Sequence, residues 1–172
     1  MALDVSRLEI VQYPNPVLRT VARPIDLIDD TVRAVAARMF ELMQESEGAG
    51  LAAPQVGLAW RMFVCRADDN HPERVFVNPG TPVLDGELDL RSEGCLSLPG
   101  LTVDVRRPID ATMTCRDLDG RSMTVTATGL MARIWQHEHD HLNGVLIIDK
   151  MTPIDRIANR RLLKELEAAG RP

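Results

Sequence analysis

Two histidines and a glutamate in the segment 137–141, which reads HEHDH, have the types and spacing of a catalytic metal site. On a helix, residues four apart lie about one turn apart on the same face, so His137 and His141 can hold one ion between them. Glu138 then lies beside that ion. With the thiolate of Cys95, three protein ligands leave a position for water, which the ion acidifies and a neighbouring carboxylate deprotonates. These residues predict a metal-dependent hydrolase.

The residues around this motif favour a helix over 130–142. Leu130 and Ile134 fall on the same stripe as the two histidines of the motif, so we expect the histidines to point into the protein with the apolar side chains. An Asn-Gly pair at 143–144 marks the helix end. His139 falls on the opposite side of the helix, and we expect that it is not a ligand.

Other interpretations of the motif differ in their third ligand. A metalloprotease with a third histidine needs that residue where this chain has Ile147. A thermolysin-like site takes a glutamate from a later helix, and the candidate, Glu165, lies in a charged tail that we expect at the surface. Because the motif is short, two satisfied core histidines remain an alternative when it is taken alone.

The cysteines supply a candidate third ligand. The chain has three, an odd number without a Cys-x-x-Cys pair, which argues against a disulfide framework and suits a reducing cytosol. Cys65 and Cys115 lie in strand-like runs, where a free cysteine behaves as a small buried apolar group. Cys95 instead follows a glycine and precedes a Ser-Leu-Pro-Gly turn, which can present its side chain to a site.

Three separated segments resemble the signatures of the peptide deformylase family, in the expected order. They are 48–55 (GAGLAAPQ), 93–97 (EGCLS) and 136–142 (QHEHDHL). The opening 11–19 (VQYPNPVLR) also resembles the family's usual start, so the similarity extends from about the tenth residue to the end of the metal helix. One departure is 101–103 (LTV), where some members carry an arginine that touches the substrate backbone.

The resemblance implies an enzyme that removes the formyl group from the N-terminal formyl-methionine of newly made polypeptides and releases formate. Its metal ligands would be Cys95, His137 and His141. Glu138 would take a proton from water and deliver one to the departing amine. The side-chain amide of Gln55 and the backbone N–H of Leu96 would stabilise the oxyanion.

The resemblance also implies a place for the substrate, which would add as an extra strand whose amide N–H donates to the Gly50 carbonyl. The other substrate-binding residues would be Ala49, Gly94, Leu130, Arg133 and Ile134, the last three near a pocket for the methionine side chain. The glycines at 48 and 50 permit close backbone approach. A nucleotide site is not expected there, because no Gly-Lys-Ser/Thr follows.

The implied cofactor is one divalent metal ion, Fe²⁺ in cells, while Zn²⁺, Ni²⁺ or Co²⁺ would also suit the purified protein. The implied partners are formyl-methionyl nascent peptides. Docking on the ribosome would use a basic strip of the C-terminal helix, made of Arg156, Arg160, Arg161 and Lys164. The alternative for these residues is a solvated helix face with Glu165 and Glu167 nearby.

Composition limits the remaining possibilities. A chain of 172 residues with 45% hydrophobic content suits one catalytic domain over 1–172. A net charge of -5 disfavours sequence-independent nucleic-acid binding as the main activity. The segment 1–9 lacks an apolar signal core, and no apolar stretch reaches membrane-spanning length, so we expect no membrane association and a cytoplasmic location.

The pattern of apolar residues predicts an α+β fold: antiparallel β-sheets packed around a central metal-binding helix, with an N-terminal-half helix and a C-terminal helix. An amphipathic helix is expected over 31–45, and short β-rich runs fill 61–128, with a turn at Asp119-Gly120. A last helix starts at 152–155, with its apolar face formed by Ile154, Ile157, Ala158, Leu162 and Leu166.

Asp140 lies beside the ligand stripe, where a helix would rarely bury an unpaired charge. We predict Arg107 as its partner, which would hold the strand after Cys95 against the metal helix.

Two rival functions use the same residues. A domain in which the metal only stabilises the fold would need a fourth Cys or His ligand. The remaining histidines do not suit that role, because we expect His71 in a loop and His139 on the far face of the helix. A peptidase acting on internal bonds would use a glutamate or a third histidine in place of Cys95. The open site with three ligands is therefore the favoured interpretation.

Overall fold

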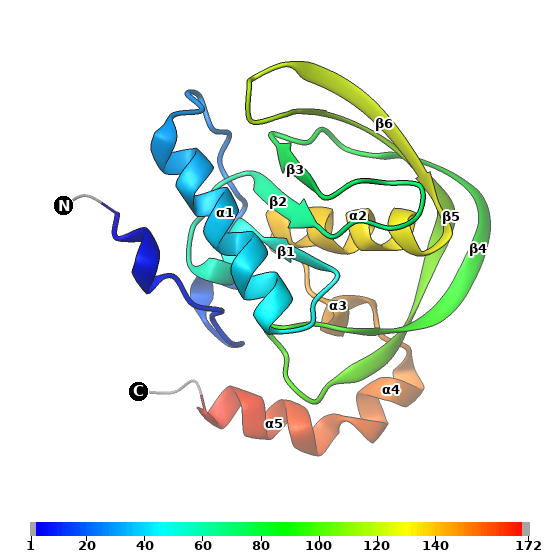
Figure 1. The fold of residues 1–172 in the computed structure, drawn as a ribbon. Helices are drawn as coiled ribbons and strands as arrows, with labels where there is room; N and C mark the ends of the chain where they lie inside the picture. The colour runs from blue at the N-terminus through cyan, green and yellow to red at the C-terminus, as the bar shows by residue number, and fades with distance from the viewer. Residues whose placement is uncertain (1–2, 170–172) are drawn as a thin grey trace.

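The computed structural model describes residues 3–169, and its antiparallel sheet curves around one central helix (Figure 1). The α-helices are α1 (Asp30–Glu45), α2 (Gly129–Leu142), α3 (Ile147–Lys150), α4 (Pro153–Ala158) and α5 (Arg160–Ala169). The strands are β1 (Gly50–Ala52), β2 (Met62–Cys65), β3 (Arg74–Val77), β4 (Val83–Gly94), β5 (Thr102–Arg116) and β6 (Ser122–Thr128). Short 3-10 helices are η1 (Val5–Arg7), η2 (Pro16–Arg19) and η3 (Ala53–Val56). The predicted α+β class is confirmed.

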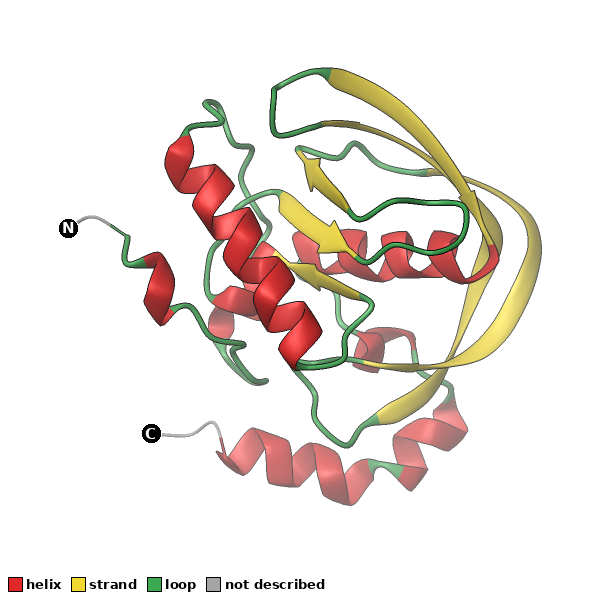
Figure 2. Cartoon of the chain, viewed as in Figure 1, coloured by secondary structure: helices red, strands yellow, loops and turns green. Residues whose placement is uncertain are grey.

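The strands form one six-stranded sheet in the order β1-β2-β3-β5-β4, with β6 on the other side of β5. The longest ladder joins β4 to β5, from Val83 opposite Thr112 to Gly94 opposite Thr102. A single pair, Val77 opposite Arg116, connects this long-stranded half to the short strands β1–β3. The sequence predicted antiparallel β-sheets, and this pair joins the two halves into one continuous sheet. In Figure 2 the long strands bend around α2, so the sheet encloses the helix that carries the histidines.

Helix α1 matches its predicted range because its pattern and its caps agree. The side chain of Asp29 accepts a hydrogen bond from the backbone N–H of Val32 and so caps the first turn. The buried face consists of Val32, Val35, Ala36, Met39, Leu42 and Met43, which belong to a core cluster with side chains of β1, β2 and β3. This packing holds the end of α1 next to the glycine-rich segment 48–50.

Helix α2 lies inside the sheet and packs against β1, β2, β5 and β6. Its Trp135 is 1% exposed and lies 5.1 Å from the ring of Phe76, which in turn stacks on Phe63 at 4.3 Å. Burial of these large side chains fixes the rotation of α2, since aromatic burial dominates core energetics. The neighbouring positions 137, 138 and 141 therefore face one defined direction.

The predicted C-terminal helix is two helices, and the expected apolar face is only partly buried. Asn159 ends α4, and its side-chain amide donates to the Asp155 carbonyl. Leu162 and Leu166 pack partly against the core, as expected. Ile154 and Ile157, in contrast, are each 78% exposed, because α4 turns that side of the chain outward before α5 begins. The assignment of these two isoleucines to the buried face was wrong.

The last residue of the glycine-rich segment 48–50 opens strand β1, where Gly50 lies opposite Cys65 of β2. Within residues 3–169, none of the helices combines the length and apolar character needed to cross a membrane.

Candidate active site

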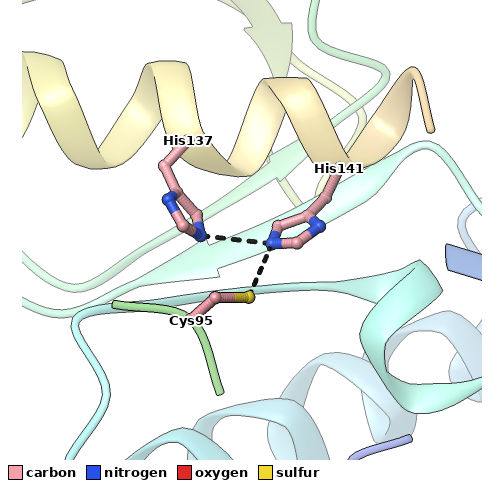
Figure 3. Close-up of side chains that lie close together, drawn as sticks. All are labelled: Cys95, His137 and His141. Atoms are coloured by element: carbon pink, nitrogen blue, oxygen red, sulfur yellow. Dashed lines mark hydrogen bonds between the residues drawn. The ribbon is translucent and has the colours of Figure 1, made fainter. Parts of the chain in front are cut away.

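The side chains of Cys95, His137 and His141 converge at one point beside α2 (Figure 3). Nε2 of His141 lies 3.2 Å from Nε2 of His137 and 3.4 Å from the sulfur of Cys95. The two histidines project from successive turns of α2. The thiol comes from the turn that follows β4, where the backbone N–H of Leu98 donates to the Cys95 carbonyl.

These donor atoms fit a single divalent ion. A tetrahedral ion with bonds of about 2.0–2.1 Å to nitrogen and about 2.3 Å to sulfur separates two nitrogens by about 3.3 Å, and sulfur from nitrogen by about 3.6 Å. The three ligand atoms lie within 4.8 Å of one another. Nδ1 of the buried His141 has no hydrogen-bond partner among the described residues. This observation argues against the alternative in which both histidines are core residues with satisfied hydrogen bonds.

Glu138 is 3% exposed and projects beside the ligand cluster. Its Oε2 atom is buried without a hydrogen-bond partner in the described part of the chain. Burial raises the pKa of this carboxyl group to about 7, because the charged form loses its hydration. A carboxyl group with a pKa near neutrality can both accept and donate a proton, which suits a general base that later acts as an acid.

Gln55 directs its amide group toward the cluster. Its Oε1 accepts a hydrogen bond of 2.9 Å from the backbone N–H of Ala52, which leaves the NH₂ group to face the other way. Nε2 lies 3.6 Å from the sulfur of Cys95 and 3.3 Å from the hydroxyl oxygen of Ser97. The side chain is 1% exposed, so this orientation is fixed by its surroundings. Leu96 directly follows Cys95 in the same turn and also lines the cleft.

A cleft of about 560 Å³ opens onto this cluster. All residues predicted to bind substrate line it: Ala49, Gly50, Gly94, Leu130, Arg133 and Ile134. Leu130 is 55% exposed, so it lies at the mouth of the cleft and not in the interior as its place on the helical stripe suggested. Thr102 and Leu101 line the same cleft, at the segment that departs from the family pattern.

The N-terminal segment ties the two loops of the site together. The backbone N–H of Val11 donates to the carbonyl of Gln55, and the N–H of Tyr13 donates to the carbonyl of Ser97. The N-terminal segment therefore contacts both the segment that carries the Gln55 amide and the turn that carries the Cys95 thiol.

Residues excluded as ligands lie elsewhere. His139 is on the other side of α2, where its Nε2 accepts from the Arg61 guanidinium at 3.1 Å, and burial lowers its pKa to about 4. Burial raises the pKa of Cys65 to about 12 and that of Cys115 to about 11, so both remain thiols in the core. Glu165 pairs with Arg161 on the surface of α5.

The predicted pair between Arg107 and Asp140 is confirmed, with a guanidinium nitrogen 2.8 Å from the carboxylate. Sequence reasoning missed the residue on the other side of Arg107. Glu93 accepts two hydrogen bonds from that guanidinium and lies 3.1 Å from Nδ1 of His137. Burial alone would raise the pKa of Glu93, but the contacts with His137 and Arg107 hold it well below the usual range.

A thiol and two imidazoles, arranged for one ion beside a buried carboxylate at the end of an apolar cleft, define a metal-dependent hydrolase. Within that class, the polypeptide deformylase model matches residues 7–157. The chain belongs to the polypeptide deformylase family.

Several relatives align over nearly the whole chain. The peptide deformylase of Stutzerimonas stutzeri is 41% identical, over 95% of this chain and 96% of its own. That of Borreliella burgdorferi is 46% identical, over 83% and 86%. Among solved structures, the peptide deformylase of Plasmodium falciparum superimposes with a TM-score of 0.88 at 39% identity, covering 94% of this chain and 96% of that one.

Proposed function

We propose that this protein, acting as one catalytic domain, removes the formyl group from the N-terminal formyl-methionine of newly made polypeptides and releases formate. The observation that carries the proposal is the position of Glu138, whose buried carboxylate lies next to the convergent Cys95, His137 and His141 at the inner end of the cleft. Cys95, His137 and His141 would hold a divalent ion, which would acidify water and polarise a carbonyl oxygen.

Glu138 takes a proton from the attacking water while the water oxygen adds to the formyl carbon. The same carboxyl group then returns the proton to the amine nitrogen as the C–N bond breaks, which yields formate and a free amine. Both steps use one buried carboxyl group, which the pKa of about 7 supports.

Gln55 and Leu96 are proposed as donors to the oxyanion that forms between these steps. The Gln55 amide is directed toward Cys95 by its contact with Ala52, so it is oriented before substrate arrives. Removing one donor of this kind typically lowers the rate by about 100-fold to 1000-fold.

The cleft supports a substrate that lies along β1. Gly50 begins that strand, and its carbonyl is proposed to accept the substrate amide N–H. Leu130 and Ile134 would lie near the pocket for the methionine side chain, and Ala49 and Gly94 would contact the substrate elsewhere in the cleft. For Arg133, only the aliphatic stem is proposed to contribute, because its guanidinium donates to Glu93, Val105 and Asp89.

The metal in cells is proposed to be Fe²⁺, which mixed sulfur and nitrogen ligands accommodate as well as they do Zn²⁺. The enzyme is proposed to act in the cytoplasm, where ribosomes supply formylated chains and where free thiols such as those of Cys65, Cys95 and Cys115 remain reduced. Docking on the ribosome is proposed through the exposed basic side of α5.

The proposal is tested by measuring formate release from a formyl-methionyl peptide, with the same peptide carrying an acetyl group as the control. Formate release that depends on added divalent metal supports it. Cys95→Ala is expected to lose metal and activity together. A protein that cleaves internal peptide bonds, or that holds metal without Cys95, would contradict the proposal and favour one of the rival functions.

A further inference from the structure

A buried cluster of charges lies behind the metal ligands, and Glu93 is at its centre. The two oxygens of Glu93 accept hydrogen bonds of 2.6 Å and 2.9 Å from Arg107 and of 2.6 Å from Arg133. The same carboxylate lies 3.1 Å from Nδ1 of His137. Glu93 is 7% exposed, Arg107 3% and Arg133 5%, so water does not compete for these contacts.

The cluster extends beyond these contacts through two further carboxylates. Arg107 also donates to Asp140, which lies 3.2 Å from Lys150, and Arg133 lies 3.9 Å from the carboxylate of Asp89. The carboxylates of Glu93, Asp140 and Asp89 therefore balance the cations of Arg107, Arg133 and Lys150. Because its charges neutralise one another, the cluster can remain buried next to a metal site without needing the metal ion or its ligands as counter-charges.

Each metal ligand is linked to this cluster. His137 contacts Glu93 directly. Cys95 follows Glu93 by two residues, at the end of β4, and His141 follows Asp140 by one, at the end of α2. Arg107, on β5, bridges Glu93 and Asp140 and so connects the turn that carries the thiol to the helix that carries the imidazoles.

We propose that Glu93 is a positioning residue that orients the imidazole of His137 for metal binding. With its Nδ1–H donated to Glu93, the ring directs Nε2 toward Cys95 and His141. Such outer partners of a metal-bound histidine fix which nitrogen faces the ion, and their loss typically weakens metal binding by about 10-fold to 100-fold. His141 has no such partner among the described residues, so the cluster orients one of the two rings.

This inference rests on the metal site of the proposed function, but its test measures metal affinity and ring contacts and not hydrolysis. The test variant is Glu93→Gln, which keeps the shape of the side chain and removes its charge. The matched control is Asp140→Asn, which removes the same charge from the same cluster and leaves the contact between Glu93 and His137 intact. The dissociation constant for Zn²⁺ is measured by competition with a chromophoric chelator, at a temperature where circular dichroism shows all three proteins folded.

Glu93→Gln is expected to raise the dissociation constant for Zn²⁺ by about 10-fold to 100-fold, and Asp140→Asn is expected to change it much less. Equal weakening in both variants would mean that net charge, and not orientation of His137, controls affinity, and would overturn the proposal. Unchanged affinity in Glu93→Gln would also overturn it. Failure of the wild-type protein to bind Zn²⁺ would instead contradict the proposed metal site itself.

A second measurement does not depend on the folding of any variant. In the Zn²⁺-loaded wild-type protein, the Nδ1–H of His137 is expected to give an NMR signal that is shifted downfield and protected from exchange with water, because a buried carboxylate accepts it. Absence of a protected Nδ1–H at His137 would overturn the proposal. In Asp140→Asn the signal is expected to persist, whereas in Glu93→Gln it should move upfield and exchange faster.

Discussion

The side chain of Glu138 occupies the space that a side chain on Gly50 would need. A Cβ atom built on Gly50 would lie 2.4 Å from Oε1 of Glu138, closer than any real contact allows. Only glycine at this position leaves the carboxylate where it lies. Gly50→Ala is therefore expected to displace Glu138 and to lower the rate of deformylation by about 100-fold, the usual cost of a displacement near 1 Å, while metal content is retained.

The control for this variant is Gly48→Ala. There a Cβ atom would lie 2.8 Å from Cδ1 of Leu96, the far end of a flexible side chain that can rotate away. A steady-state assay should therefore find a much larger loss in Gly50→Ala than in Gly48→Ala. Equal losses would show that the contact with Glu138 is not responsible.

Glu138→Gln is expected to retain its metal and to lose nearly all hydrolysis. The amide keeps the shape of the side chain but cannot accept the proton from water. Metal analysis and formate release, measured on the same preparation, check both parts. A variant that keeps more than about a tenth of the wild-type rate would rule out the assigned role, since general bases contribute about 100-fold or more.

His139→Ala is expected to leave metal content and rate close to those of the wild-type protein, because His139 lies on the other side of α2 from the ligands. The structure adds a cost in stability that the sequence did not predict. His139 is 8% exposed and accepts a hydrogen bond from the half-buried guanidinium of Arg61, so its removal loses a hydrogen bond from a charged donor and should cost about 1–3 kcal/mol of unfolding free energy. Chemical denaturation measures that cost, and loss of metal in this variant would contradict the assigned geometry.

The iron assignment predicts sensitivity to air. Protein loaded with Fe²⁺ under anaerobic conditions is expected to have a high initial rate of deformylation and to lose activity on exposure to air. The peptide that contains Cys95 should then gain the mass of added oxygen. The Zn²⁺ form should be slower and steady, because zinc keeps one oxidation state. If the iron form is no faster than the zinc form and air changes neither, iron is not the metal that this protein uses.

The ribosome assignment predicts a salt-sensitive interaction through α5. Arg156 donates to the Ile148 carbonyl and Arg161 pairs with Glu165, so Arg160 and Lys164 are the better test residues. A truncation after Asp155 would remove the basic side chains of α5, but it would also remove leucines that pack on the core. Reversing the charge at two exposed positions leaves those leucines in place. Arg160→Glu with Lys164→Glu should abolish co-sedimentation with ribosomes in a salt-sensitive assay, and unchanged co-sedimentation would leave only a solvated helix face.

Sequence reasoning succeeded where the cause of structure is local. The spacing of apolar side chains defined α1 and α2. The pair of Asp140 and Arg107, which are 33 residues apart, is an exception that followed from the rule against an unpaired buried charge. Sequence reasoning missed Glu93, whose partners are 14, 40 and 44 residues away, because no periodic pattern marked this residue as buried, whereas Asp140 lies beside a helical stripe of buried side chains. It misplaced Ile154 and Ile157 because their spacing fits a buried face, whereas exposure was decided by the break at Asn159.

The order of the site residues along the chain has a consequence for how the enzyme is made. Cys95 and His141 are 46 residues apart, and Gln55 lies 40 residues before Cys95. Contacts between such distant segments form only after the intervening chain has folded, because loop-closure entropy opposes them until then. Since synthesis proceeds from the N-terminus, a growing chain presents the thiol of Cys95 before either imidazole exists. Metal loading with this ligand set therefore has to wait until α2 has been made and enclosed by the sheet.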